Sequence, residues 1–163
     1  MAGRSGAGQK NLIRPVSNTS PLIAFSYLGE LSILHRLFNS EILIPPAVAN
    51  ELRGHVLPDW IQVRAPKRPV DAPLLRASLG PGESEAIALA LEVSADPVLL
   101  DDKAARRMAT VLGLPLIGTL GMLLKAKHAG LIPAIRPRLE VLQKLPFHIA
   151  PGILEAALYE AGE

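Results

Sequence analysis

The chain has 163 residues, of which 49% are hydrophobic, and this combination fits one domain with a substantial core. Its net charge of +2 is too small to indicate a nucleic-acid-binding protein by itself, and the absence of cysteine excludes disulfides and a thiol-based redox role. The sequence shows no apolar run long enough to cross a membrane and no signal-peptide core, so we expect a cytoplasmic protein without membrane contact.

The first part of the chain predicts strands that alternate with helices. Residues 1–11 are small, polar and rich in glycine, which is typical of a disordered arm or an expression remnant, and we expect one domain over residues 12–163. The segment 17–21 joins N-cap residues to a proline, as at the start of a helix. The expected elements are a strand at 12–16, a helix that begins within 17–21, a helix at 28–38, a strand at 41–44 and a helix at 46–53.

The second part continues this alternation after an irregular, basic and proline-rich stretch at residues 54–73. Within that stretch, residues 60–63 alternate like a short edge strand. The further expected elements are a helix at 83–94, a strand at 98–100, a helix at 102–112, a strand at 116–117 and helices at 119–129, 139–145 and 153–159. Such repeated units predict an α/β fold, a mostly parallel sheet with helices on both faces.

The last predicted helix carries an apolar stripe made of Ile153, Leu154, Ala157 and Leu158. Because these residues repeat at helical spacing, they lie on one side of the helix. We expect the helix to dock on the core or across a dimer interface.

Acidic residues fall where an alternating fold brings strand ends and helix starts to one edge of the sheet. Glu51 lies in the helix expected at 46–53, Glu83 begins the helix before a buried strand, and Asp101 ends that strand. Hard oxygen ligands of this kind suit Mg²⁺. Asp102 is open to two interpretations, a second metal ligand or the N-cap of the next helix.

Glu83 and Glu85 cannot both face such a site, because two residues apart on a helix they point in nearly opposite directions. Glu85 shares its side with another charge, Glu92, which suggests the wetter face. We therefore choose Glu83 as the ligand and keep Glu85 as the alternative.

Other chemistries find little support in the sequence. The four histidines show no metal-binding spacing, and the glycines of segment 80–82 form neither a P-loop nor a dinucleotide-binding pattern. A nucleophile elbow with a Ser-His-Asp order is also missing.

Five segments in order resemble PIN-domain proteins, and more closely the VapC-like branch described as DUF3368. The resemblance covers about residues 16–163. The segments are VSNTSPL at 16–22, IPPAV at 44–48 with Glu51-Leu52, GESEAIALA at 82–90, LLDDKAAR at 99–106 and GTLG at 118–121.

The resemblance implies a three-layer α/β/α fold around a mostly parallel sheet and a Mg²⁺- or Mn²⁺-dependent ribonuclease. It also implies RNA as substrate, a homodimer and, for VapC-like members, a toxin held inactive by a small antitoxin protein. The four acidic positions of the family fall on Asn18, Glu51, Glu83 (or Glu85) and Asp101, with Asp102 beside the last. Thr19, Thr119 and Arg106 are the expected substrate contacts.

Asn18 departs from the family pattern, which usually has an aspartate at this position. Its amide oxygen can still bind a metal ion, but a negative charge is missing from the site. The resemblance therefore leaves a second possibility, a non-catalytic binding module with an impaired metal site.

Overall fold

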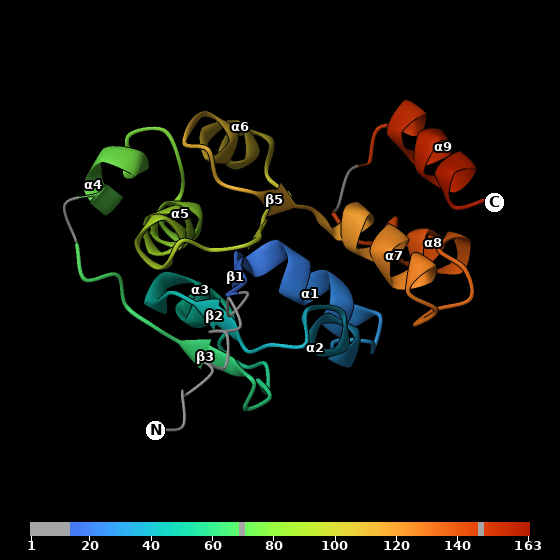
Figure 1. Ribbon diagram of the computed structural model, residues 1–163, viewed down its shortest axis with the longest axis horizontal. Coiled ribbons are helices and arrows are strands. Elements are labelled where there is room, and N and C mark those ends of the chain that lie inside the picture. Colours follow the sequence, from blue (N-terminus) through green and yellow to red (C-terminus); the bar gives the residue numbers. More distant parts are fainter. Residues whose placement is uncertain (1–13, 69–70, 147–148) are drawn as a thin grey trace, which may run out of the picture.

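The computed structural model describes residues 14–68, 71–146 and 149–163, which form a parallel sheet enclosed by helices (Figure 1). The strands are β1 (Val16–Ser17), β2 (Ile42–Ile44), β3 (Ile61–Val63), β4 (Val98–Leu99) and β5 (Leu116–Ile117). The helices are α1 (Thr19–Tyr27), α2 (Ser32–Phe38), α3 (Pro46–Glu51), α4 (Asp71–Arg76), α5 (Pro81–Val93), α6 (Lys103–Val111), α7 (Thr119–His128), α8 (Arg136–Leu142) and α9 (Pro151–Glu160). The described helices include none that is long and apolar enough to cross a membrane.

The strands follow the order β3-β2-β1-β4-β5, and every pairing in the described sheet is parallel. β1 therefore lies beside β2 on one side and beside β4 on the other. The chain adds β2 and β3 on one side of β1 and then β4 and β5 on its other side, so the strand order reverses between β1 and β4. In open α/β sheets, this reversal leaves a crevice at the carboxyl ends of the two strands, where ligands bind.

Alternating side chains divide the core between the two faces of the sheet. In β2, Ile42 and Ile44 belong to one hydrophobic cluster and Leu43 to the other, as the two-residue period of a strand requires. One cluster joins the sheet to α1, α2, α7 and α8, and the other joins it to α5 and α6. This is the three-layer arrangement expected from the sequence.

Most expected elements occur within a few residues of their predicted bounds, with three differences. The strand expected at 12–16 is β1, which begins only at Val16; residues 12 and 13, like the expected arm at 1–11, lie outside the described residues. The helix expected at 28–38 begins at Ser32, because Gly29 has the left-handed backbone angle φ of 69° and interrupts the helix. α4 was not expected, since it belongs to a proline-rich stretch and contains Pro73, and it packs against α5.

The C-terminal helix α9 docks on the core, which was one of the two roles expected for its apolar stripe. Ala157 is buried, Leu154 and Leu158 pack against the cluster that contains α7 and α8, and Ile153 remains 58% exposed. A dimer role of the stripe stays a prediction.

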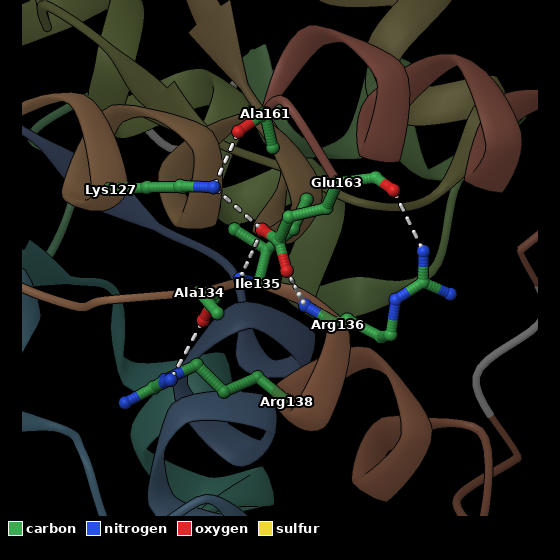
Figure 2. A network of polar contacts seen from close by, with 7 residues as sticks. All are labelled: Lys127, Ala134, Ile135, Arg136, Arg138, Ala161 and Glu163. Atoms are coloured by element: carbon green, nitrogen blue, oxygen red, sulfur yellow. Dashed lines mark hydrogen bonds and ion pairs between the residues drawn. The ribbon is translucent and has the colours of Figure 1, made fainter.

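Glu163 ties the segment after α9 to the start of α8 (Figure 2). Its carboxylate accepts hydrogen bonds from the backbone N–H groups of Ile135, at 2.8 Å, and Arg136, at 3.1 Å, and forms an ion pair with Lys127 at 3.0 Å. Lys127 also donates to the carbonyl of Ala161. The backbone hydrogen bond from Ile135 is the main cause that lowers the pKa of Glu163 to about 2.

Candidate metal site at the carboxyl edge of the sheet

Asn18 and Asp101 lie next to each other in the fold because they follow adjacent strands. Asn18 comes directly after β1, and its backbone N–H donates to the carbonyl of Leu99 in β4 at 3.0 Å. Asp101 follows two residues beyond Leu99. Both residues therefore occupy the crevice between β1 and β4 where the strand order reverses.

Asn18 holds the N-cap position of α1 but does not cap the helix with its side chain. Asparagine at this position usually accepts a hydrogen bond from the first helical turn. Here the side chain points elsewhere: its Nδ2 donates to Glu83 Oε1 at 3.4 Å, and its Oδ1 is buried without a hydrogen-bond partner among the described residues. A buried acceptor without a partner costs about 1–3 kcal/mol, which a ligand at this oxygen would recover.

Glu83 faces this site and Glu85 does not, in agreement with the choice made from the sequence. Glu85 Oε2 accepts a hydrogen bond from the backbone N–H of Ala47, at 3.0 Å, and so supports the first turn of α3. The reason given for the choice was wrong, however. The side of α5 that carries Glu85 is not wet, because Ala88 and Leu89 on that side are buried.

Glu51 reaches the same edge from the end of α3. Its carboxylate accepts a hydrogen bond from the hydroxyl of Thr19 and lies against Gly82, where an added Cβ would sit only 2.8 Å from Oε1. A side chain at position 82 would therefore push the carboxylate away. Glu51 is held at this edge by its contacts with Thr19 and with Gly82 at the start of α5. Glu83 is held there by its hydrogen bond from Asn18.

Asp101 is held at both carboxylate oxygens by Thr119, the first residue of α7. The backbone N–H of Thr119 donates to Oδ1 at 2.7 Å, and its hydroxyl donates to Oδ2 at 2.6 Å. Burial raises the pKa of the Asp101 carboxyl above its ordinary value, although the bonds from Thr119 and the positive charge of Arg106 oppose the shift. Burial therefore raises the free energy of the ionised carboxylate, and a further cation beside it would lower that free energy.

The residues after Asp101 begin α6 and add positive charge. Asp102 caps this helix, since its Oδ2 accepts from the backbone N–H of Ala105 at 2.9 Å, so the capping interpretation of Asp102 is confirmed. Arg106 donates to the carbonyl of Leu100 at 3.1 Å. Its guanidinium lies so close to Gly118 that a Cβ there would be 2.5 Å from Nη1.

A cavity of about 920 Å³ opens at this edge and extends to α9. Glu83, Asp101 and Asp102 line its acidic end, and Lys103 and Arg106 line it from α6. The remaining wall comes from β5, α7 and the segment that ends in α9 and is mostly apolar, with Leu120, Leu124, Ile149, Ile153 and Ala157 among its residues, together with the carboxylate of Glu160. The cavity thus combines carboxylates, cations and an apolar wall.

The oxygen atoms of Asn18, Glu83 and Asp101 fit a hard divalent cation that needs only one or two carboxylate ligands. Within the described ranges, no group of three or more His, Asp or Glu side chains is gathered as a metal cluster. Mg²⁺, however, is usually held by one or two carboxylates together with water and substrate phosphate. Asn18 Oδ1, which lacks a partner, and the neighbouring carboxylate of Glu83 meet this requirement, with Asp101 two residues beyond the adjacent strand β4.

The structure also shows what sequence reasoning missed. Thr19 and Thr119, expected as substrate contacts, are buried, and each donates a hydrogen bond to an acidic side chain instead. Lys103 and the apolar wall from α9 were not expected at the site. Lys103 could have been found, because it lies one helical turn before Arg106, whereas the wall depends on how α9 docks.

A doubly wound parallel sheet with acidic side chains at its switch point defines an open-sheet α/β protein, in which ligands bind at this edge. A family model described as DUF3368, a PIN domain, matches residues 14–163. The chain therefore belongs to the PIN-domain family, whose members are generally nucleases and commonly bind RNA. The search of curated proteins found no match.

Proposed function

We propose that this protein is a metal-dependent ribonuclease that hydrolyses phosphodiester bonds in RNA. The observation that carries the proposal is Asn18, an N-cap residue that leaves its helix uncapped and holds an unpartnered buried oxygen beside Glu83. Such an arrangement is costly unless the oxygen binds something, and the surrounding carboxylates favour a cation.

Asn18, Glu83 and Asp101 would hold Mg²⁺ or Mn²⁺, and Glu51 and Asp102 would add negative charge around it. A bound divalent ion lowers the pKa of water and neutralises charge on a scissile phosphate. Thr119 keeps the Asp101 carboxylate in place, and the Thr19 hydroxyl does the same for Glu51.

Lys103 and Arg106 are the groups that would bind the RNA backbone at this cavity. Both lie on the cavity side of α6, next to the acidic end. Phosphates bind Lys and Arg largely through charge, with little dependence on base identity. The apolar wall opposite them would exclude water and contact the bases.

Cleavage of a mixture of short RNAs in the presence of Mn²⁺, followed by addition of EDTA, tests the proposal. We expect cleavage that EDTA stops and that Asp101→Asn removes. The matched control is Asp96→Asn, which changes an aspartate outside the residues that line the cavity. Absence of EDTA-sensitive cleavage across several RNAs would count against the enzyme.

A non-catalytic binding module is the second candidate, and two observations favour it. Asn18 supplies no charge, and the described residues hold no cluster of three acidic side chains. Calorimetric titration with Mn²⁺ separates the two candidates. Binding that depends on Glu83 and Asp101 supports the enzyme, whereas no binding at millimolar metal supports the module.

The motifs shared with VapC-like proteins support a further part of the proposal, a homodimeric toxin with a small antitoxin partner in the cytoplasm. Sedimentation of the purified protein tests the dimer. Growth arrest on expression, absent in Asp101→Asn, tests the toxin. A monomer without effect on growth would remove this part and leave the nuclease proposal standing.

A further inference from the structure

The first turn of α7 is built against a single carboxylate. Thr119 begins this helix, and its backbone N–H and its hydroxyl donate to different oxygens of Asp101, at 2.7 and 2.6 Å. Asp101 therefore cannot rotate about its side-chain bonds without losing two hydrogen bonds. The positive end of the helix dipole adds to the attraction for the carboxylate.

Thr119 is fully buried, so its side chain has no contact with solvent. Its side chain does not line the cavity, whereas Asp101 does. Gly118, just before it, has no room for a side chain, since a Cβ would lie 3.0 Å from Asp101 Oδ1. The turn between β5 and α7 is thus shaped around the Asp101 carboxylate, and Thr119 itself reaches the cavity only through that carboxylate.

We propose that Thr119 is a positioning residue, whose hydroxyl fixes the orientation in which Asp101 presents its carboxylate to the metal ion. This inference rests on the proposed function for the ion itself. Each carboxylate oxygen can accept more than one interaction, so the bonds from Thr119 leave Asp101 able to bind a cation. Partners that orient a ligand in this way typically change metal affinity about 10–100-fold when they are removed.

Two replacements separate the hydroxyl from the shape of the side chain. Thr119→Val keeps the branched shape and removes the hydroxyl, whereas Thr119→Ser keeps the hydroxyl. Thr119→Ala serves as a second variant without the hydroxyl, should valine impair folding. The matched control is Thr110→Val, because the hydroxyl of Thr110 donates to Arg106 O within α6, at 2.9 Å, and not to an acidic side chain.

The measurements are Mn²⁺ affinity by calorimetry and the crystal structure of each variant without metal. We expect Thr119→Val to weaken Mn²⁺ binding about 10-fold or more, with the Asp101 carboxylate turned from its place beside Gly118. Thr119→Ser and Thr110→Val should retain affinity close to that of the wild type. A merely structural role would lower the melting temperature and leave the affinity unchanged.

Two results would overturn the inference: wild-type affinity in both variants that lack the hydroxyl, or equal loss in Thr119→Ser and Thr119→Val. If the wild type itself binds no Mn²⁺, the proposed function fails first. The metal-free crystal structures then still decide the point, because an Asp101 carboxylate that stays in place without the hydroxyl shows that Thr119 does not hold it.

Discussion

Replacing Gly82 by alanine should lower the RNA-cleaving activity strongly and change the stability of the fold only slightly. Gly82 is buried at the second position of α5, and an added Cβ would lie 2.8 Å from Oε1 and 3.0 Å from Oε2 of Glu51. Ordinary contact begins at 3.4 Å, so the carboxylate must retreat by about 0.6 Å. The retreat also strains the hydrogen bond that Thr19 donates to Glu51.

The expected cost in stability is small because the side chain that must move is long and flexible. Loss of the bond from Thr19 would remove about 0.5–1.5 kcal/mol. Alanine in place of glycine inside a helix returns up to about 1 kcal/mol. The free energy of unfolding should therefore fall by at most about 1.5 kcal/mol or rise by at most about 0.5 kcal/mol.

The expected loss of function is larger, because catalytic geometry tolerates little displacement. A misplacement of about 1 Å can cost about 100-fold in rate, so we expect Gly82→Ala to lower Mn²⁺-dependent RNA cleavage about 10-fold or more. Cleavage rate and thermal melting, measured on the same preparation, check both halves of the prediction.

Gly152→Ala is a close control. Gly152 also follows a proline at the start of a helix, but an added Cβ would meet no atom within 4 Å. It should melt at or slightly above the wild-type temperature and cleave RNA at the wild-type rate. The reasoning fails if Gly82→Ala cleaves as fast as Gly152→Ala, or if its activity falls only in step with its stability.

Three further predictions follow from the contacts at the site and at the end of the chain. Glu83→Gln should abolish Mn²⁺ binding in calorimetry, whereas Glu85→Gln should be nearly silent because an amide oxygen can still accept from Ala47 N–H; the reverse result would reassign the ligand. Asn18→Asp should tighten Mn²⁺ binding and lower the melting temperature in EDTA, since a second carboxylate would stand beside Glu83; no change in either would place Asn18 outside the metal site. Glu163→Gln should lower the melting temperature at neutral pH. Because the folded pKa of Glu163 is about 2, below its ordinary 4.5, the difference from wild type should be full above pH 4.5 and fade as the pH falls toward 2; a difference independent of pH would contradict this.

The sequence alone was sufficient for the order of the elements other than α4 and for the choice of candidate site residues. Local patterns predict the strands and helices; examples are the apolar run before Asp101 and the proline and asparagine around the start of α1. The family motifs then identified Asn18, Glu51, Glu83 and Asp101 as one group. Local pattern is enough here because each residue's place at a strand end or helix start follows from its own segment.

The partners of these side chains were decided by the tertiary structure. Asp102 caps α6 and Glu85 binds the start of α3 because particular backbone N–H groups lie within reach of these carboxylates. The contact of Thr119 with Asp101 likewise comes from the pairing of β4 with β5, which brings these two residues, 18 positions apart, to the same edge of the sheet. Hydrogen bonds act over about 3 Å, and distances of that order between separate elements are set by the packing of the whole core and by no single segment.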